Sequence, residues 1–372
     1  MTVADAVIIG GGIQGCSAAL HLARLGAKAV VLEMAHAGRH ASGVNAGGVR
    51  TLGRHMAEVP LAVAALEAWH RIGDLVDDDC GFESVGQVMV AETDAELTRM
   101  RSRAEDLSHA GFLHEEPIDS ADLRRLVPAV ADHCVGGLVA RRDGAANPFR
   151  ATLAFKRKAE SLGARVREGV RALGIERVPG GWEVDTDDGR IAAPAVINAA
   201  GAWADRFAAQ MGDPVPLQAI APMLMVTAPM PRFVEPVVIG GGRTLSFKQF
   251  RNGTVLVGGG HRGRADRASQ RTVLDWRELS VNAESACALF PIMRTARVVR
   301  AWAGIEGRMP DDIPVIGPSG RQDGAFHAFG FSAHGFQLAP IVGAVIADLV
   351  TSGRSRLPIE PFRIGRFRAA AG

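Results

Sequence analysis

The fold is decided by the stretch Ala6-Val7-Ile8-Ile9-Gly10-Gly11-Gly12-Ile13-Gln14-Gly15, which Ala29-Val30-Val31-Leu32-Glu33 completes. Residues 6–9 are apolar and bounded by glycine, which predicts a short buried strand. Residues 17–25 carry apolar side chains at helical spacing before Gly26, and residues 29–32 predict a second strand. Because crossovers are right-handed, the two strands should be parallel. The sequence therefore predicts a β–α–β unit that opens a doubly wound sheet.

The glycines of this unit have the spacing of a dinucleotide-binding turn. Gly10 permits a tight turn, Gly12 lets the backbone approach a pyrophosphate, and Gly15 allows close helix–strand contact. The helix N-terminus then stabilises the negative charge. Glu33 ends the second strand, where a carboxylate can accept hydrogen bonds from both ribose hydroxyls and repel a 2′-phosphate. We therefore predict dinucleotide binding.

Composition restricts the possible partners of the chain. With 372 residues the chain suits two intertwined units, and its net charge of +2 does not favour nucleic acid or an anionic membrane as a partner. The four cysteines are scattered without CxxC spacing, so no metal site is expected and a reduced, cytoplasmic setting is favoured. No apolar stretch reaches the roughly 20 residues of a membrane span. We expect a soluble protein that acts on small molecules.

The rest of the chain shows no internal repeat and no low-complexity linker. Strand-like residues at 195–198 end in Ala199-Ala200-Gly201, and a strongly apolar helix is predicted over 335–350. A region rich in proline and strands begins beyond Gly212. Further helices are predicted over 59–75, 94–110, 150–162 and 275–289, and a small strand meander over 166–170, 174–177 and 182–185.

Four segments carry a resemblance to a known family. Residues 38–48 read Gly-Arg-His-Ala-Ser-Gly-Val-Asn-Ala-Gly-Gly, and residues 196–203 read Val-Ile-Asn-Ala-Ala-Gly-Ala-Trp. Residues 300–304 read Arg-Ala-Trp-Ala-Gly and precede Pro310-Asp311 and Pro314-Val315-Ile316-Gly317; residues 330–337 read Gly-Phe-Ser-Ala-His-Gly-Phe-Gln. In this order, and together with the glycine turn, they resemble the D-amino acid oxidase superfamily, which includes sarcosine oxidase, glycine oxidase and related amine or opine dehydrogenases.

The resemblance implies FAD as the cofactor and an α/β fold. A Rossmann-type FAD-binding domain would be assembled from residues 1–80, 145–212 and 300–372. A largely antiparallel α+β substrate domain, residues 81–144 and 213–299, would be inserted in it. A helix that begins near Gly335 would place free N–H groups where reduced flavin carries negative charge.

The residues expected to bind the cofactor follow from the glycine turn and from the resemblance. In the dimethylglycine and sarcosine dehydrogenase branch, a histidine similar to His40 attaches covalently to the flavin; Arg39 stands here where that branch has tryptophan, which favours a noncovalent site. The full set is Gly10, Gly12, Ile13, Gln14, Gly15, Glu33, Arg39, His40, Ser42, Asn45, Ala46, Gly47, Gly48, Ala200, Gly201, Trp203, Gly304, Gly335, Phe336 and Gln337.

The residues expected to act on substrate are fewer. Arg50 and Arg54 resemble in position arginines that sarcosine oxidase places above the flavin, and a bidentate arginine suits a substrate carboxylate. His55 lies beside them, and His261 and His334 are candidates for tuning substrate ionisation. Each arginine can also be a solvated surface charge, and each of His261 and His334 a structural hydrogen-bonding group. The chain has no tyrosine, so the tyrosines that anchor substrate in some relatives are absent.

Lys248 is the sixth candidate. It lies in the strand-like segment 245–250, where alternation puts Ser246 and Lys248 on one face. Sarcosine oxidase activates oxygen with a lysine above the flavin, but the motifs do not align that lysine with Lys248. An exposed lysine on an edge strand is the favoured interpretation.

The resemblance implies an FAD-dependent oxidase or dehydrogenase. It would oxidise the C–N bond of an amino acid or secondary amine by hydride transfer to flavin N5, and the imine would then hydrolyse. Sarcosine-like amines, D-amino acids, imino acids and opines all remain open as substrates. A partner subunit or another acceptor could take the electrons in place of oxygen. The alternative is a flavin-binding or electron-transfer subunit without catalytic activity of its own.

Overall fold

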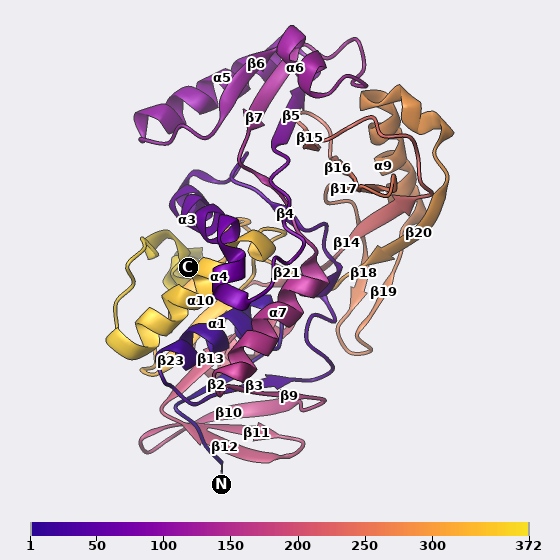
Figure 1. Ribbon diagram of the computed structural model, residues 1–372. Helices are drawn as coiled ribbons and strands as arrows, with labels where there is room; N and C mark the ends of the chain where they lie inside the picture. Colours follow the sequence, from indigo (N-terminus) through magenta and orange to yellow (C-terminus); the bar gives the residue numbers. More distant parts are fainter. Residues whose placement is uncertain (1, 371–372) are drawn as a thin grey trace.

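The predicted β–α–β unit lies at the centre of a six-stranded sheet in the computed structural model, which describes residues 2–370 (Figure 1). Strand β2 (Ala6–Ile9) pairs in parallel with β3 (Ala29–Glu33) and with β13 (Ala195–Asn198), so β2 contacts a strand that lies nearly 190 residues later in the chain. The strand order is β22 (Val315–Pro318), β23 (Ala325–Phe329), β13, β2, β3, β9 (Arg165–Glu168).

The two faces of this sheet have different covers, and the alternation of β2 shows both. Ala6 and Ile8 pack in a core with helices α1 (Ile13–Arg24), α3 (Val59–His70), α7 (Pro148–Ser161) and α10 (Gly335–Ser352). Val7 and Ile9 pack against a four-stranded sheet and Phe207 of α8 (Ala204–Gln210). A strand buried on both faces reads as a continuous apolar run, as residues 6–9 do.

The meander predicted over residues 166–185 is partly wrong. The four-stranded sheet consists of β1 (Thr2–Val3), β12 (Gly189–Ala193), β11 (Gly181–Thr186) and β10 (Ala172–Val178). The first predicted strand, observed as β9, instead pairs in parallel with β3 at the edge of the six-stranded sheet. Its short alternating sequence fits either sheet, and the crossover through α7 decides which one it joins.

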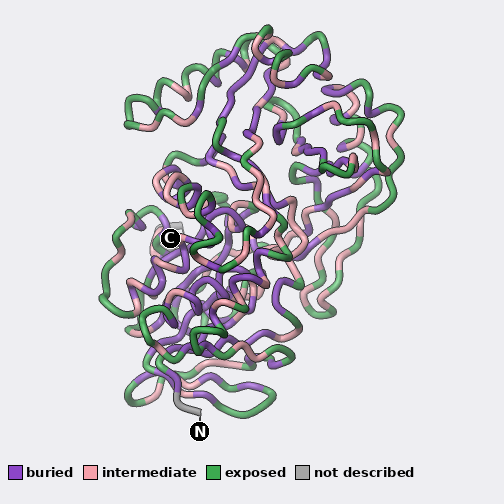
Figure 2. The backbone as a smooth tube through the Cα atoms, viewed as in Figure 1, coloured by how far each residue is buried: buried purple, intermediate pink, exposed green. Residues whose placement is uncertain are grey.

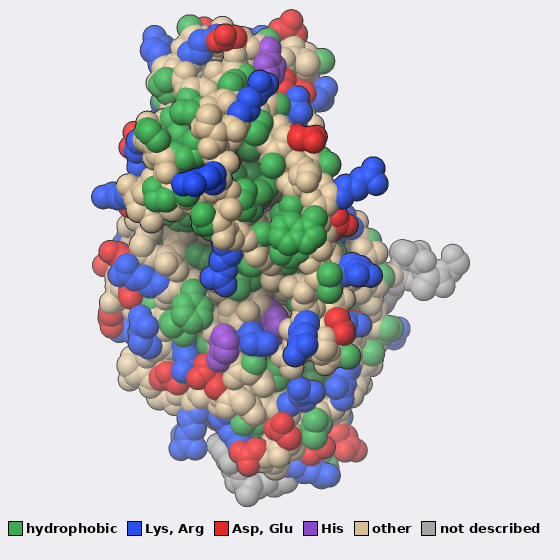
Figure 3. Space-filling model, turned by 90° about the vertical axis from the view of Figure 1, so that its right-hand side faces the viewer, with side chains coloured by type: hydrophobic (Ala, Val, Ile, Leu, Met, Phe, Trp, Pro, Cys, Tyr) green, Lys and Arg blue, Asp and Glu red, His purple; other side chains and the backbone are tan. Residues whose placement is uncertain are grey.

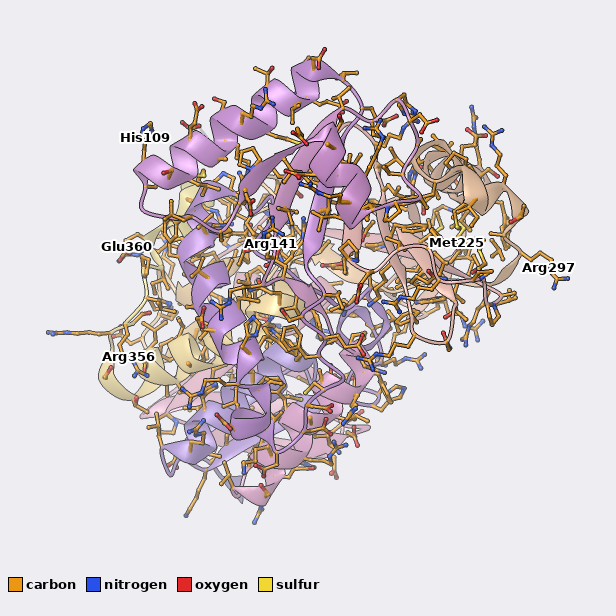
Figure 4. The ribbon with its side chains drawn as sticks, turned by 45° about the horizontal axis from the view of Figure 1, so that its top comes forward. His109, Arg141, Met225, Arg297, Arg356 and Glu360 are labelled. Atoms are coloured by element: carbon orange, nitrogen blue, oxygen red, sulfur yellow. The ribbon has the colours of Figure 1, made fainter. Side chains whose placement is uncertain are left out.

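An eleven-stranded, largely antiparallel sheet forms the other half of the molecule. Its central strand β14 (Gln218–Thr227) pairs with β17, β18, β20 and β21. The remaining strands are β5 (Gln87–Ala91), β6 (Glu116–Asp119), β7 (Gly136–Ala140), β15 (Val237–Gly240), β16 (Ser246–Gln249), β17 (Val255–Gly258), β18 (Arg262–Asp266), β19 (Arg271–Val273), β20 (Val298–Ala303) and β21 (Glu306–Arg308). Helices α5 (Asp94–His109), α6 (Ser120–Leu126) and α9 (Trp276–Leu289) accompany it. Met225 of β14 lies among these strands (Figure 4).

Helix α10 joins the end of the chain to its beginning. It is long and apolar enough to cross a membrane by length and composition, but 61% of its most apolar window is buried inside the protein. It packs across α1, where Ser17 Oγ donates to the Ala339 carbonyl at 2.7 Å. Buried residues concentrate in this part of the chain trace (Figure 2). Its apolar character is therefore explained by the core.

Candidate active site

A cavity of about 540 Å³ lies between the two large sheets. Its walls include the glycine turn, the segment 38–48, the start of α10 and one face of the eleven-stranded sheet. Segments from the two ends of the chain meet here, because the Gln14 amide donates to the Gly335 carbonyl at 2.7 Å. The N-termini of α1, at Ile13, and of α10, at Gly335, therefore line the same cavity.

The glycine turn shows why no side chain fits at two of its positions. A Cβ on Gly10 would lie 2.3 Å from the Ala199 oxygen, and Gly10 has a φ of +110°. A Cβ on Gly15 would lie 1.9 Å from the Gly10 oxygen. Glu33 braces the turn by accepting from the Gly11 N–H at 2.8 Å and the Ala35 N–H at 2.9 Å, and burial raises the pKa of its carboxyl. The turn is held open toward the cavity.

The glycine-rich segment after Glu33 forms the next wall. It contains a short helix, α2 (Ala41–Val44), and Ser42 Oγ accepts from the Ile13 N–H at 2.9 Å. His40 lies against Trp203 with ring centroids 5.0 Å apart. Burial lowers the pKa of His40 to about 4, and its Nε2 has no hydrogen-bond partner among the described residues. His40 is therefore a neutral ring with a free polar atom at neutral pH.

The turn before α10 has an unusual backbone. Ser332 and Ala333 have φ angles of 49° and 71°, a region that costs non-glycine residues free energy. The Glu306 carboxylate accepts from the Ala333 N–H at 2.5 Å and holds this conformation. Burial raises the pKa of Glu306 to about 7. Left-handed backbone beside a ligand cavity is typical of functional sites.

Two arginines enter the cavity from the loop that follows β4 (Gly48–Val49). The carboxylate of Asp143, fully buried, fixes this loop by accepting from the Thr51 N–H and Oγ1 and from the Leu52 N–H at 2.8–3.0 Å. No carboxylate oxygen of the described residues lies within 4.0 Å of the Arg50 or Arg54 guanidinium. Arg54 is only 2% exposed and its Nη1 has no partner among those residues.

Burial disfavours the charged form of both arginines. Burial, together with the charge of Arg50, lowers the pKa of Arg54 to about 9 although the charges of Glu58 and Asp143 oppose the shift, and burial also lowers the pKa of Arg50. Arg54 Nε donates to the Arg50 carbonyl at 3.1 Å and Arg50 Nη1 to the Leu52 carbonyl at 3.2 Å, but neither bond neutralises the charge. A buried cation without an acid partner is unfavourable unless a ligand supplies the negative charge. The loop is therefore a candidate anion-binding site.

A histidine–carboxylate pair lies nearby. His334 Nδ1 is 3.0 Å from the Oε2 of Glu58, a fully buried side chain. Burial and the Arg54 charge lower the pKa of His334 although Glu58 opposes them, so the ring is neutral at neutral pH. Burial raises the pKa of Glu58, but the His334 hydrogen bond and the His334 and Arg54 charges outweigh it and the net pKa is lowered. A neutral ring that donates through Nδ1 presents Nε2 as an acceptor.

Comparison with known proteins gives the family. A family profile described as FAD dependent oxidoreductase, DAO, matches residues 5–349. The chain belongs to this family. It is 26% identical to a glycine oxidase of Geobacillus kaustophilus, over 99% of this chain and 98% of that protein, and 26% identical to an opine oxidase subunit of Rhizobium meliloti, over 98% of each. The solved structure of an L-proline dehydrogenase from P. horikoshii superposes with a TM-score of 0.91 at 26% identity and covers 99% of this chain and 98% of that one.

This DAO-family membership confirms four predictions: the family, the mixed α/β fold class, FAD as cofactor, and enzymatic oxidation of an amine or amino acid. The cavity fits the cofactor independently. Five of the eight buried polar atoms that lack a partner among the described residues belong to residues lining it: Gln14 Oε1, His40 Nε2, Arg54 Nη1, Gln87 Oε1 and Gln337 Oε1. A bound ligand with many polar atoms would supply these partners.

Most residues expected to bind FAD line the cavity. These are Gly10, Gly12, Ile13, Gln14, Glu33, Arg39, His40, Ser42, Asn45, Ala46, Gly47, Gly48, Ala200, Gly201, Trp203, Gly304, Gly335, Phe336 and Gln337. Gly15 does not line it and lies inside α1, where it permits the close approach of Gly10. Their individual contacts with FAD stay predictions.

Two of the expected substrate residues do not reach the cavity of this DAO-family chain. His55 is exposed and caps a 3-10 helix (Met56–Glu58), where its Nδ1 accepts from the Ala57 N–H at 3.2 Å. His261 is buried but lies outside the lining, with Nδ1 2.8 Å from Glu278 Oε2 and Nε2 3.2 Å from the Thr244 carbonyl. Both have local hydrogen-bonding roles, so the geometry corrects their placement at the site. Arg50, Arg54, His334 and Lys248 do line it.

The expectation of an exposed, edge-strand Lys248 is wrong. Strand β16 lies inside the sheet between β15 and β17, and Lys248 is 9% exposed. Ser246 and Lys248 do share a face, as the alternation predicts, and that face lines the cavity. The burial depends on both neighbouring strands, and the sequence pattern does not predict one of them, Val237–Gly240.

Three residues at this DAO-family site escape sequence reasoning. Glu306 lies in a three-residue strand with no periodic signal, two positions after the Gly304 motif. Gln87 lies in a strand of otherwise apolar residues, where one amide gives a weak signal. Asp143 lies outside the motifs that carry the family resemblance. A polar residue close to a family motif is the only signal that could have indicated Glu306, and a single amide among apolar residues is the only one for Gln87.

Proposed function

We propose that this enzyme oxidises the C–N bond of an amino acid or secondary amine whose carboxylate is bound by Arg54, with Arg50 beside it. The observation that carries the proposal is a nearly fully buried guanidinium with a free Nη1, in the same cavity as the glycine turn. FAD, when bound, supplies the acceptor for the hydride of the C–H bond. The names of the related glycine oxidase and opine oxidase subunit support a substrate of this class.

The arginine loop would fix the substrate by its carboxylate. A charge-assisted, bidentate contact sets orientation as well as affinity. Asp143 and Glu115 hold the loop backbone, since Glu115 accepts from the Gly53 N–H at 2.7 Å and from Arg103 at 2.7 Å. The guanidiniums are thereby placed before substrate arrives. Preorganisation of this kind lowers the entropic cost of binding.

His334 would accept the proton from the substrate ammonium. An amine must be neutral before its C–H bond gives up hydride, and a neutral imidazole is a suitable base near pH 7. Glu58 orients the ring through Nδ1 and stabilises the imidazolium that forms. The role is a proposal, supported by the shared cavity and by the charge pair.

The domain division would follow the two large sheets. We propose residues 1–80, 145–212 and 300–372 as the FAD-binding part and residues 81–144 and 213–299 as the substrate part. The membership of β2, β3, β9, β13, β22 and β23 in one sheet supports this. Strand β20 crosses the proposed boundary at 300, because it belongs wholly to the eleven-stranded sheet.

The test is anaerobic titration of the FAD-loaded protein with a panel of amines and amino acids, followed by readmission of oxygen. Bleaching of the flavin band by at least one carboxylated amine is expected; a folded, FAD-loaded protein that no member bleaches would contradict the proposal. Fast reoxidation would indicate oxygen as acceptor, and slow reoxidation a separate acceptor or partner subunit.

The Arg54→Gln variant tests the carboxylate contact. Truncating one partner of a buried charge pair costs about 2–5 kcal/mol, so kcat/KM should fall at least about 30-fold, mainly through KM. Arg54→Lys should keep part of the affinity. Arg297→Gln is the matched control, because that side chain is exposed and extends away from the molecule (Figure 4). Equal KM values for Arg54→Gln and Arg297→Gln would refute the assignment.

A further inference from the structure

A second cation without an acid partner lines the cavity, on strand β16 of the eleven-stranded sheet. Lys248 lines the cavity, and no carboxylate oxygen of the described residues lies within 4.0 Å of its ammonium. The nearest acid that influences it, Glu83, is paired with Arg251 at 2.6 Å. The ammonium lies over the Phe250 ring, 4.8 Å from its centroid. This wall thus carries positive charge that no described residue neutralises.

The register of the sheet places Lys248 in a row of cavity residues. Lys248 pairs with Leu256 of β17, and the β15–β16 register sets Val237 opposite Lys248. Val237 pairs in turn with Gln87 of β5. All four line the cavity. Because adjacent strands lie about 4.8 Å apart, the backbones of Lys248 and Gln87 are roughly 10 Å apart across Val237.

Gln87 is the second polar member of this apolar row. It is 1% exposed and its Oε1 has no partner among the described residues. This oxygen is an acceptor, so it needs an N–H or O–H donor from a ligand, whereas the Lys248 ammonium can donate three hydrogen bonds to an anion. The unpaired ammonium of Lys248 is therefore the group in this row that favours an anionic ligand, and the Gln87 amide lines the same cavity.

The first anion site lies at the β5 end of the same wall. A Cβ built on Gly53 would be 2.7 Å from Met89 Cε and 3.8 Å from Arg50 Nη1, so the Arg50 guanidinium lies close to Met89. Met89 is two residues from Gln87 on the same strand and the same face. The arginine loop and Lys248 are therefore separate positive points that flank one space.

We propose that Lys248 binds a second carboxylate of the substrate, so that the enzyme prefers secondary amines or amino acids that carry two carboxylates. The proposal rests on the proposed function for the first carboxylate and names the substrate class of that site. Burial lowers the pKa of Lys248 to about 8, so the ammonium is still mainly charged at neutral pH and gains from a bound anion. On the molecular face shown in Figure 3, the Lys and Arg side chains are interspersed with Asp and Glu side chains.

The first experiment is a binding measurement that needs no turnover. Calorimetry on the FAD-loaded protein compares glutarate with its monoamide, glutaramate, which has the same shape and one carboxylate. The wild type should bind glutarate at least about tenfold more tightly, Lys248→Met should bring the ratio near one, and Lys248→Arg should keep a preference for glutarate. Equal affinities in the wild type, or an unchanged ratio in Lys248→Met, would overturn the proposal.

The second experiment uses turnover and separates the two proposals. Glycines N-substituted with an ω-carboxyalkyl chain of one to three methylenes are compared with their ω-carboxamides by the rate of anaerobic flavin bleaching. Arg54→Lys should slow both series equally, whereas Lys248→Met should lower the carboxylate-to-carboxamide ratio. If neither series bleaches the flavin while the glutarate preference holds, the amine oxidation fails and the anion site stands. Equal loss on both series in Lys248→Met would assign the lysine to the flavin and overturn the proposal.

Discussion

Gly343→Ala should destabilise the enzyme and weaken FAD binding together. Gly343 lies in α10 where this helix crosses α1, and an added Cβ would be 2.1 Å from Ser17 Oγ, 2.5 Å from the Ser17 carbonyl carbon and 2.6 Å from its oxygen. Since two of these atoms are backbone, no rotamer change relieves the overlap. The helices must separate, and the 2.7 Å bond from Ser17 to Ala339 is lost.

The magnitude follows from three contributions. Overpacking of a tight core costs up to about 3 kcal/mol. Loss of one buried hydrogen bond costs about 1 kcal/mol, and the better helix propensity of alanine returns about 1 kcal/mol. The net loss of unfolding free energy is therefore about 3 kcal/mol. Because α10 starts at Gly335, which accepts from Gln14, its displacement also moves the wall that faces FAD.

The assay combines urea unfolding of the FAD-free protein with FAD titration by fluorescence quenching. Gly73→Ala is the matched control, since Gly73 lies inside α4 (Ile72–Val76) and a Cβ there would meet nothing within 4 Å. That variant should be as stable as the wild type or slightly more stable. A Gly343→Ala protein within about 0.5 kcal/mol of the wild type, below the usual effect of a core substitution, would refute the reasoning.

Three further variants test the site. Gly15→Ala should purify folded but colourless, because its Cβ would lie 1.9 Å from the Gly10 oxygen and close the turn; normal FAD content would contradict this. Glu58→Gln should move the acid limb of the kcat/KM profile to lower pH, because Glu58 raises the pKa of His334; an unmoved limb would remove His334 as the base. Glu306→Gln should flatten the pH dependence of stability. Burial raises the Glu306 pKa from 4.5 to about 7, so its folded form favours the proton, and stability falls as pH rises through that window. The measurement is the change in the urea midpoint of the FAD-free protein between pH 5 and pH 8. The same change in the wild type and in Glu306→Gln would contradict this prediction.

The sequence pattern predicts those helices and strands whose formation depends mainly on neighbouring residues. Residues 6–33 form the predicted strand, helix and strand, because a run buried on both faces and a helix between glycine turns need little from the rest of the chain. No short sequence segment could predict that Gly12 and Gly335 line the same cavity, since 323 residues separate them. The order of the family motifs supplied that information.

Where the prediction failed, non-local pairing decided the outcome. An exposed edge is the natural expectation for Lys248, because lysine inside a strand usually blunts one. Strand β15 covers that edge, and it is held by a parallel pairing with β5 that spans 150 residues. His261 follows three glycines and looks available in the sequence, but Glu278 of α9 folds against it. Partners of this kind, which are distant in sequence, cannot be predicted from a short segment alone.

The presence or absence of a carboxylate partner divides the cations of this protein into two groups. Arg103, Arg243 and Arg267 each have a carboxylate at 2.7 Å or less, so the fold itself compensates them. Arg54 and Lys248 are more deeply buried and have none among the described residues. A sequence selected for stability alone would replace such groups with apolar side chains, because burying an unpaired charge is unfavourable. Arg54 and Lys248 both line the flavin cavity and burial lowers the pKa of each, which supports the proposal that a ligand with negative charges binds there.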